Sequence, residues 1–403
     1  MNKFISSMKY IKLKDILAVF VFISMLIPSI ICRIIFKIKG KKLWLICEDG
    51  KNARDNGYYF YKYLCKVNPK NIAYYYVIDK NSYDYNKLKN EKNIIQFKSI
   101  LHWILYMSAD YNISNHKNGN PNQPLFYFIH IYLRLFNNRV FLQHGITKDN
   151  AEWLYYKNTR FKYFVCGAKR EYEYIKENFG YPEKNLIYTG FPRFDTLHEF
   201  KVKNNQILLM PTWRNWLGRE TNRFGEKFEF VKTNYYKCWN GILNNRKLID
   251  WLEKNNYYIL FYPHINMQKF IDKFEVNTKN IQILKAKDAD IQELLKESSL
   301  LITDYSSVYM DFAYMKKSTI YYQFDYDEYR NKQYKDGYFN YLKDGFGPVC
   351  NDEDTVVKNI ISFYQDGCQT KYIDRMNKFF ELYDENNCER IFKILEGYCY
   401  EKK

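Results

Sequence analysis

The chain has 403 residues, of which 47% are hydrophobic, including 41 Tyr and 30 Phe. This is enough apolar material for two domains with their own cores, and it excludes a disordered chain. Lys and Arg number 62 and Asp and Glu 45, so the net charge of +17 suits an anionic partner: a membrane surface, a nucleotide or a phosphate polymer.

Of the possible anionic partners, nucleic acid has the least support from the sequence. The sequence has no zinc-knuckle spacing, no RNA-binding aromatic signature and no Arg-rich arm. The nine cysteines are odd in number and form no CxxC pair, which favours a reducing cytosol over a disulfide framework.

Residues 1–42 form a separate segment. Its stretch Ile16–Cys32 runs for 17 residues without a charge, at the short end of what spans a bilayer, and Pro28 would kink a helix there. Basic residues lie on both sides, so the positive-inside rule gives no orientation, and no small-residue cleavage site follows. We expect a membrane anchor that either spans the bilayer or dips into the cytoplasmic leaflet. The alternative is a buried N-terminal helix of the globular body.

The next part alternates predicted strands with predicted helices, which indicates a parallel sheet. The strands are expected at 43–47, 72–78, 93–97, 111–114, 138–143, 161–166 and 186–188, and the helices at 58–67, 100–108 and 169–178. Gly50 and Gly57 bracket the loop after the first strand. In an open parallel sheet, ligands bind at such carboxyl ends.

His144-Gly145 follows the strand at 138–143, at the same edge of the predicted sheet. Histidine changes protonation near neutral pH more easily than other side chains, and Gly145 would allow a backbone or a ligand to approach closely. A lone His is more often structural than catalytic, and its place at a strand end brings the two interpretations to even odds.

The second half repeats the pattern after a polar linker at Lys201–Asn205. Strands at 206–210 and 257–262 end at Pro211-Thr212-Trp213-Arg214 and at Pro263-His264. Arg214 would suit a phosphate fork, although an isolated surface Arg would explain it equally well. Residues 215–236 are expected to be a loop or insertion, and 356–364 and 371–395 amphipathic helices.

A strand at 300–302 runs into the hydroxyl-rich turn Thr303–Ser307 and then a helix at 308–315 and a strand at 319–324. A helix N-terminus beside Ser306 and Ser307 has free N–H groups and is a ready anion site. The simpler interpretation is that Asp304 or a serine is only an N-cap.

These strand-end motifs, together with Gly190–Asp195 (GFPRFD), resemble the CDP-glycerol glycerophosphotransferase family of teichoic-acid primases and polymerases and their relatives in capsule loci. The resemblance covers about residues 43–395. Its most specific piece is Asp290–Tyr322, and Asp55–Leu64, Asp344–Pro348 and Asp384–Arg390 (DENNCER) also match.

The resemblance implies a GT-B-like fold of class α/β: two doubly wound parallel-sheet domains facing a central cleft, here with an N-terminal membrane-associating helix. It implies four parts, which are a membrane-associating segment at 1–42, an acceptor-side domain at 43–200, a donor-binding domain at 201–370, and helices at 371–403 that pack back on the body. CDP-glycerol or a related CDP-alditol would bind in the second domain, and no metal or other cofactor is implied.

In the reaction that the resemblance implies, an acceptor hydroxyl attacks the β-phosphorus and expels CMP. His144 and His264 are the catalytic candidates: His144 would accept the proton, and His264 would act on the pyrophosphate. The donor and phosphate ligands would be Thr212, Arg214, Ser306 and Ser307, with Asp304 first a cap or organiser and second a ligand. Gly145, Asn56 and Gly57 are assigned to the acceptor side.

The partners implied are the donor, a lipid-linked saccharide or polymer acceptor, and an anionic membrane surface, with the enzyme at the cytoplasmic face of the cell membrane. Two departures from the common family pattern stand out. This chain has HGITKD where many members have HGTPLK, which leaves the acceptor's identity open, and Asn215 replaces an Asp that follows TWR.

Two other functions remain possible from the sequence. A GT-B sugar-nucleotide glycosyltransferase would need a carboxylate that binds ribose in the second domain, where this chain has a hydroxyl-rich loop. A non-catalytic scaffold of the polymer machinery would be expected to lose one of the two strand-end histidines, and both are present.

Overall fold

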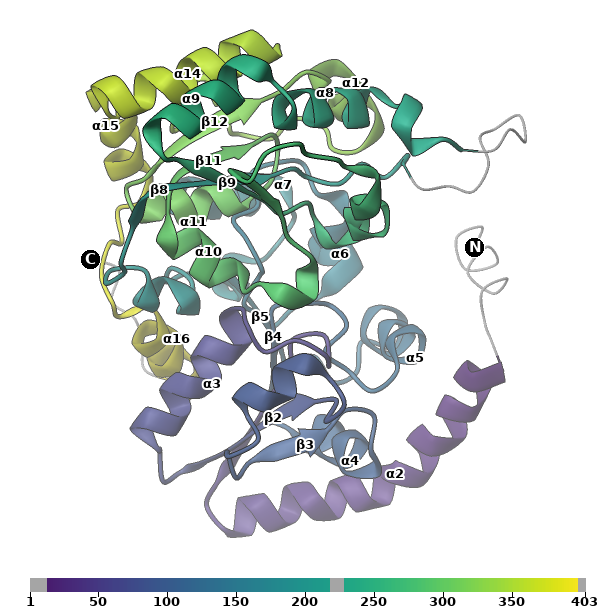
Figure 1. Ribbon diagram of the computed structural model, residues 1–403. Coiled ribbons are helices and arrows are strands. Elements are labelled where there is room, and N and C mark those ends of the chain that lie inside the picture. Colours follow the sequence, from purple (N-terminus) through teal and green to yellow (C-terminus); the bar gives the residue numbers. More distant parts are fainter. Residues whose placement is uncertain (1–12, 218–227, 398–403) are drawn as a thin grey trace. The chain divides into compact units, whose positions relative to one another are not determined.

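The computed structural model describes residues 13–217 and 228–397 (Figure 1). Two of the basic residues before the apolar stretch, Lys9 and Lys12, lie outside these ranges, as do part of the 215–236 loop and the tail from 398. Contacts divide the chain into two units. Unit 1 contains the described residues up to His144, Glu152–Asp195 and the residues from Asp384 on; unit 2 contains Gly145–Ala151 and Thr196–Tyr383.

Unit 1 is built on a seven-stranded, all-parallel sheet in the order β3-β2-β1-β4-β5-β6-β7. The change of direction between β1 and β4 is the point where open α/β sheets bind ligands. The strands are β1 Lys42–Ile46, β2 Ile72–Ile78, β3 Ile94–Gln96, β4 Tyr111–Ser114, β5 Arg139–Phe141, β6 Tyr163–Cys166 and β7 Leu186–Tyr188. All seven predicted strands are present, although the strand predicted at 138–143 is reduced to three residues.

The helices of unit 1 follow the predicted alternation. They are α2 Leu13–Ile38, α3 Asn56–Val67, α4 Ile100–Ser108, α5 Gln123–Phe128, α6 Tyr156–Thr159, α7 Lys169–Asn178 and α16 Asn387–Glu396, and the π-helix η2 spans Ile129–Leu133. Among the described residues, Ile16–Ile38 is the one helix that is long and apolar enough to cross a membrane, judged by length and composition.

Unit 2 carries a six-stranded, all-parallel sheet in the order β10-β9-β8-β11-β12-β13, which is the doubly wound order with its switch point between β8 and β11. The strands are β8 Lys203–Met210, β9 Tyr258–Phe261, β10 Ile281–Ile283, β11 Ser298–Thr303, β12 Ser318–Tyr322 and β13 Val349–Cys350. The predicted α/β class with two parallel sheets and an N-terminal apolar helix is confirmed.

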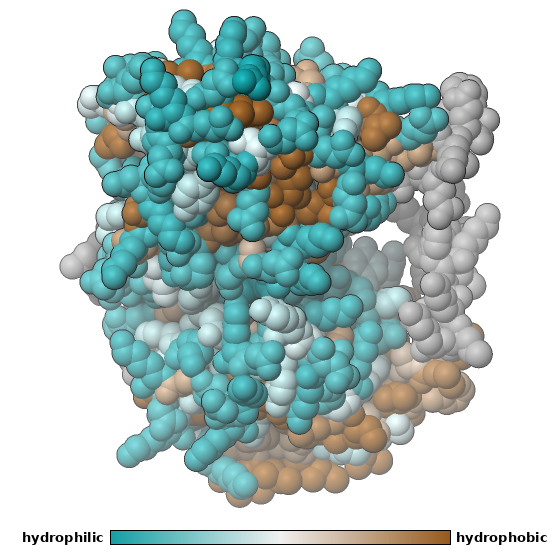
Figure 2. All heavy atoms as spheres, viewed as in Figure 1, coloured by the Kyte–Doolittle hydropathy of each residue, from teal (hydrophilic) through white to brown (hydrophobic). Residues whose placement is uncertain are grey.

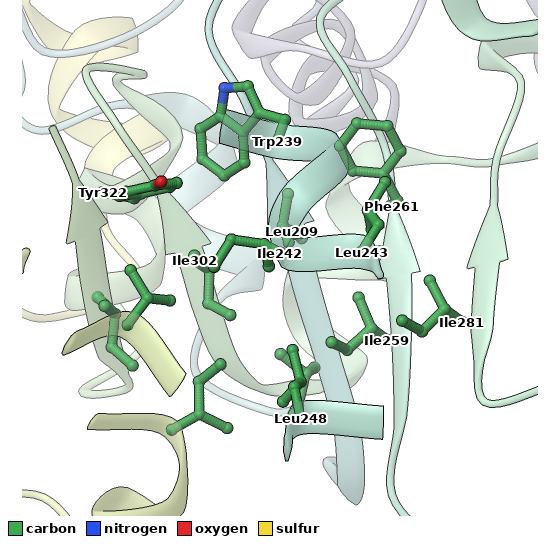
Figure 3. Close-up of a cluster of buried hydrophobic side chains, with 14 of the residues drawn as sticks. Leu209, Trp239, Ile242, Leu243, Leu248, Ile259, Phe261, Ile281, Ile302 and Tyr322 are labelled. Atoms are coloured by element: carbon green, nitrogen blue, oxygen red, sulfur yellow. The ribbon is translucent and has the colours of Figure 1, made fainter. Parts of the chain in front are cut away.

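The helices of unit 2 are α8 Asn234–Leu243, α9 Arg246–Asn255, α10 Ile291–Glu297, α11 Val308–Tyr314, α12 Tyr326–Lys332, α13 Tyr341–Asp344, α14 Glu353–Asp366 and α15 Thr370–Phe379. Trp239 on α8 and Leu248 on α9 pack on Leu209, Ile259 and other apolar side chains of the central strands (Figure 3). The prediction of a loop through 236 was wrong for its last residues, because Thr233 caps α8 by accepting a hydrogen bond from Tyr236 N at 3.1 Å.

The C-terminal segment differs from the sequence prediction. The single helix expected at 371–395 is two helices, α15 in unit 2 and α16 in unit 1. The Asp195 carboxylate fixes the start of α16 by accepting hydrogen bonds from Asn387 N at 2.8 Å and Cys388 N at 2.9 Å. Arg390 pairs with Asp384 at 2.8 Å and donates to the carbonyl of Thr189 at 2.9 Å.

These contacts explain why GFPRFD and DENNCER occur together: the second motif returns the chain to unit 1 and closes on the first. The boundary between the units lies between Asp195 and Thr196, whereas the sequence prediction placed it between residues 200 and 201. The segment Gly145–Ala151 also belongs to unit 2.

Candidate functional site

In unit 1, His144 lies just after the carboxyl end of β5. Gln143, just before it, has a φ of 58°, so the chain turns sharply after the strand. The side-chain amide of Asn56 holds this turn by donating to the carbonyls of Leu142 at 3.2 Å and Gln143 at 2.8 Å. His144 is therefore presented from a rigid strand end, with its side chain accessible to solvent.

His116, which follows β4, stacks on His144 with ring centroids 5.2 Å apart and an interplanar angle of 9°. Strands β4 and β5 are neighbours, with Ser114 opposite Phe141, so the two histidines leave the sheet side by side. Next to them, Asn115 donates to Asp55 at 2.7 Å, and Arg193 pairs with Asp55 at 2.9 Å.

The pKa of His144 is lowered to about 4. Desolvation by the surrounding protein is the main cause, the charge of His116 acts in the same direction, and the Asp55 carboxylate acts against it. The residue as a whole is exposed to solvent. The imidazole is neutral at pH 7 and has a lone pair available to accept a proton.

Sequence reasoning did not single out His116, Asn115 or Asp55 as site residues. The signal was present: Asn115 and His116 directly follow the predicted strand at 111–114, as His144 follows its own. Only the sheet order, which makes β4 and β5 adjacent, joins the two strand ends.

The structure corrects the assignment of Asn56 and Gly57 to acceptor contacts. Both are buried, and the Asn56 amide is committed to β5 and to Arg193 N. Gly57 is tightly packed, since a Cβ there would lie 2.9 Å from Cγ of Glu48. Both residues position the loop and the strand end.

In unit 2 the ends of β8 and β11 lie side by side at the switch point, with Met210 opposite Thr303. Asp304, the next residue, is fully buried and accepts hydrogen bonds from Thr212 N at 2.8 Å and Tyr305 N at 2.7 Å. Asp304 thus organises the two strand ends, which is one of the two alternatives in its first predicted role. The Thr212 hydroxyl is buried and has no hydrogen-bond partner among the described residues.

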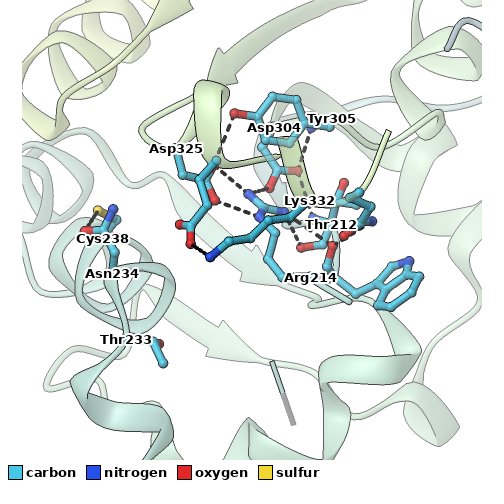
Figure 4. A network of polar contacts seen from close by, with 12 residues as sticks. Thr212, Arg214, Thr233, Asn234, Cys238, Asp304, Tyr305, Asp325 and Lys332 are labelled. Atoms are coloured by element: carbon cyan, nitrogen blue, oxygen red, sulfur yellow. Dashed lines mark hydrogen bonds and ion pairs between the residues drawn. The ribbon is translucent and has the colours of Figure 1, made fainter. Parts of the chain in front are cut away.

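The guanidinium of Arg214 is not free to bind a phosphate, as the sequence had suggested it would be. Its guanidinium is fully buried and makes a two-pronged contact with Asp325, Nε to Oδ2 at 2.7 Å and Nη2 to Oδ1 at 3.0 Å (Figure 4). Nη2 also lies 2.8 Å from Asp304, and Nη1 donates to the Thr212 carbonyl at 2.9 Å. These partners occupy the fork, so Arg214 holds the strand ends together and is not available as a phosphate ligand in this arrangement.

Burial opposes the charge on Arg214, but the carboxylates of Asp304 and Asp325 outweigh it and raise the pKa. Tyr305 closes the cluster: its hydroxyl donates to Asp325 at 3.1 Å, and its ring stacks on Tyr329 with centroids 3.8 Å apart. Arg214 pairs with both acids, so one guanidinium charge is shared between two buried carboxylates inside unit 2.

Ser306 and Ser307 precede α11 and are half-buried. Ser307 is the N-cap residue and makes no side-chain cap bond, while Ser306 Oγ lies 3.5 Å from Val308 N. Asp304 is not the cap, so that simpler interpretation was wrong for the acid. The residue that approaches Gly145 is Ser307: a Cβ on Gly145 would lie 2.5 Å from Ser307 Oγ.

His264 follows β9 and stacks on Trp213, with centroids 6.1 Å apart. Desolvation lowers its pKa to about 4, so the ring is neutral at pH 7. Its Nδ1 accepts a hydrogen bond from Asn266 N at 3.1 Å, which leaves the ring proton on Nε2. The free side of His264 is therefore a hydrogen-bond donor.

Both departures from the family pattern have structural explanations. Asp149 of HGITKD lies in unit 2, where it pairs with Lys148 and, at 2.6 Å, with Arg330. Lys148 and Asp149 are both buried. Asn215 donates through Nδ2 to the carbonyl of Lys332, the last residue of α12, at 2.9 Å, and a carboxylate could not make this bond.

Comparisons with known proteins agree with these motifs. A family model described as CDP-glycerol:poly(glycerophosphate) glycerophosphotransferase matches residues 30–397. The chain is 33% identical over 375 residues to the minor teichoic acid biosynthesis protein GgaB of Bacillus subtilis, covering 90% of this chain and 40% of that protein. It is 24% identical to the teichoic acid poly(glycerol phosphate) polymerase of Staphylococcus epidermidis, covering 86% of this chain and 48% of that protein.

Among solved structures, a histidine variant of the wall teichoic acid polymerase TagF, soaked with CDPG, matches with a TM-score of 0.66. The identity is 20%, and the match covers 90% of this chain and 92% of that chain. This likeness shows the fold. The chain spans less than half the length of the two curated relatives named above.

Proposed function

The chain belongs to the CDP-glycerol:poly(glycerophosphate) glycerophosphotransferase family, and on that premise we propose that it transfers glycerol phosphate, or a related alditol phosphate, from a CDP-alditol to a hydroxyl of a membrane-linked acceptor. The transfer would release CMP and extend or prime a teichoic acid or capsular polymer. The observation that carries the proposal is a neutral imidazole at a strand end in each unit, His144 after β5 and His264 after β9.

His144 acts as the base. Its neutral ring takes the proton from the acceptor hydroxyl as the oxygen attacks the β-phosphorus of the donor. The bond between that phosphorus and the oxygen bridging to CMP breaks, and the electron pair leaves with CMP. General-base assistance of this kind is typically worth about 10²- to 10⁴-fold in rate.

Unit 2 holds the donor's phosphates. The unpartnered Thr212 hydroxyl, the Ser306 and Ser307 hydroxyls, and the N–H groups at the start of α11 supply donors around the switch point. His264 adds its Nε2–H, which stabilises the charge that develops on departing CMP. Arg214 and Asp304 act through these groups by fixing the loops that carry them.

The protein works at the cytoplasmic face of the cell membrane, where a cytosolic nucleotide donor and a lipid-linked acceptor can meet. The apolar helix α2 and the net charge of +17 support this location. The acceptor is a lipid-linked saccharide or the growing polymer itself.

Release of CMP tests the proposal. The full chain is incubated with CDP-glycerol, CDP-ribitol or a UDP-sugar in the presence of membrane-derived acceptor. We expect CMP from a CDP-alditol and no UDP from the UDP-sugar; UDP release would favour a glycosyltransferase, and no release with any donor would overturn the proposal.

The residue roles are tested by substitution. His144→Ala should reduce turnover by at least about 10²-fold and leave the donor's Kd nearly unchanged. His198→Ala is the matched control, because His198 lies beside Tyr314 and Tyr383 in unit 2, away from the strand ends. Unchanged turnover in His144→Ala would remove the base assignment.

A further inference from the structure

Unit 1 buries polar side chains in the neighbourhood of His144. Polar side chains normally lie at the surface, as the teal spheres over most of the face in view show (Figure 2). Asn115 is instead completely buried, and Arg193 is only 3% exposed. A buried polar group is costly unless it is hydrogen-bonded, so the partners of these two residues indicate their role.

Asp55 is the common partner of the two buried residues. Its Oδ2 accepts a hydrogen bond from Nδ2 of Asn115 at 2.7 Å, and its Oδ1 pairs with Nη1 of Arg193 at 2.9 Å. Oδ1 also accepts a hydrogen bond from Asn56 N at 2.7 Å, which makes Asp55 the N-cap of α3. Both carboxylate oxygens are therefore occupied, and the carboxylate is held in one orientation.

Asn115 connects this carboxylate to His144. A ring N–H of His144 donates to the backbone carbonyl of Asn115. The side chain of Asn115 is anchored on Asp55, so the carbonyl that receives the imidazole belongs to a residue that is held at both ends. A neutral imidazole has one N–H, and this bond therefore leaves the other ring nitrogen unprotonated and able to accept a proton.

Arg193 supplies the counter-charge for Asp55. It lies in the short helix η5, Pro192–Thr196, within the GFPRFD motif. The guanidinium carbon is 5.2 Å from the ring centroid of Phe191 and 5.5 Å from that of Phe194. The first half of the motif is thus connected to the strand end that carries the proposed base.

The charged groups around His144 act in opposite directions. The Asp55 carboxylate favours a protonated ring, whereas His116 and Arg193 oppose it. Glu48 lies behind Asp55, whose backbone N–H donates to it at 2.9 Å. Burial, together with the charge of Asp55, raises the pKa of Glu48 to about 8, so this carboxyl is uncharged in the pH range in which His144 titrates.

We propose that Asp55, Asn115 and Arg193 form a positioning network that holds His144 in one tautomer, with its N–H on the Asn115 carbonyl and its other ring nitrogen free as the base. Asp55 and Asn115 orient the ring, and Arg193 prevents the carboxylate from holding it in the protonated form. This rests on the proposed function, because the network affects turnover only if His144 is the base. The tautomer and the titration of the ring are nevertheless measurable without donor or acceptor.

NMR on the full chain, labelled with ¹³C and ¹⁵N in its six histidines, measures both properties. The signals of His144 are assigned from their loss in His144→Gln, and we expect one tautomer. Arg193→Gln should raise the pKa of His144 from about 4 to about 5 or above, because a cation is lost and Asp55 is left without its partner. Asp55→Asn/Arg193→Gln removes both charges and should return the pKa to the parent value or below it. An unmoved titration in Arg193→Gln would overturn the proposal.

Turnover tests the orientation of the ring. Asn115→Ala removes the anchor on Asp55 and should show both neutral tautomers of His144. Its kcat should fall by about 10- to 100-fold, which is part of what general-base assistance is worth. The KM for CDP-glycerol should change less than about twofold, because the proposed donor ligands belong to unit 2. A single tautomer with an unchanged kcat would contradict the role of Asn115. This variant keeps both charges, so it carries the test if Arg193→Gln does not fold.

Two further variants separate positioning from folding. Arg390→Gln is the matched control, because it also breaks a pair between a buried arginine and a carboxylate in unit 1, that with Asp384. It should lower the melting temperature and leave the titration of His144 in place. Arg193→Lys keeps the positive charge and should keep the parent titration. Full turnover in His144→Ala would refute the base assignment, whereas a tautomer and titration that ignore the Asn115 and Arg193 variants would refute the network whatever the activity.

Discussion

The imidazole rings of His116 and His144 stack in parallel 5.2 Å apart, although 28 residues separate them in the chain. The stack exists because β4 and β5 are hydrogen-bonded neighbours, and His116 and His144 follow two and three residues after their ends. A positive charge on one ring opposes protonation of the other. His116 is therefore a positioning and electrostatic partner of the proposed base.

The stack makes a prediction about pH. Because the pKa of His144 is lowered to about 4, the base stays unprotonated well below pH 6.5. The kcat/KM for CDP-glycerol should stay level from pH 8 to about 5 and fall to half near pH 4. His116→Gln removes the ring whose electrostatic effect lowers the pKa of His144, so that pKa should rise and the acid limb should move towards the ordinary histidine value of about 6.5. An unmoved limb would contradict the electrostatic role.

Unfolding in acid must be separated from that limb. Burial lowers the pKa of His102 and of His130 to about 3, and both rings are neutral in the folded state. The unfolded chain binds more protons between about pH 6.5 and 3, so these histidines stabilise the fold above pH 6.5 and lose that contribution as the pH falls. Circular dichroism on the assay samples gives the pH at which unfolding begins. Only the loss of activity at pH values above that point is assigned to protonation of His144.

Arg214→Gln should destabilise unit 2 by about 3–5 kcal/mol, because it leaves Asp304 and Asp325 buried without a counter-charge. Denaturant unfolding followed by tryptophan fluorescence measures the change. Arg246→Gln, which removes an exposed pair with Asp250, is the matched control and should cost less than about 1 kcal/mol. If Arg214→Gln kept its stability and only raised the KM for the donor, Arg214 would be a phosphate ligand after all.

Gly145→Ala should weaken donor binding, because the new Cβ would meet Ser307 Oγ at 2.5 Å and displace the start of α11. Overpacking of this kind typically costs about 1–3 kcal/mol. The KM for CDP-glycerol should rise and partly recover in the double variant Gly145→Ala/Ser307→Gly, relative to Ser307→Gly alone. Equal losses in both backgrounds would show that the clash is not the cause.

The protein should be more stable to unfolding with Asn215 than with the Asp that is more common in the family at this position. Asn215→Ala loses the hydrogen bond to the Lys332 carbonyl, worth about 1 kcal/mol, and Asn215→Asp also places a negative charge against the C-terminus of α12. Thermal unfolding should therefore rank the three proteins Asn, Ala, Asp in decreasing stability. An Asp variant as stable as the parent would leave this departure from the pattern unexplained.

The sequence predicted the parts of the fold that depend on local pattern. Alternating apolar runs and amphipathic segments gave both parallel sheets, and α4 was predicted to the residue at Ile100–Ser108. The break between α15 and α16 was missed, because it depends on Asp195, almost two hundred residues away, bonding to Asn387 N. No local signal carries that contact.

The same division holds for the candidate site. The sequence by itself determined that His144, His264, Thr212 and the 303–307 turn lie at carboxyl ends of strands, because a strand and the residue after it are neighbours in any fold. Only the tertiary structure decided that Arg214 is buried against two acids, that Asn56 supports β5, and that His116 joins His144. Those facts depend on which strands are adjacent and on where each charge is desolvated, and both are fixed by packing between residues distant in the chain.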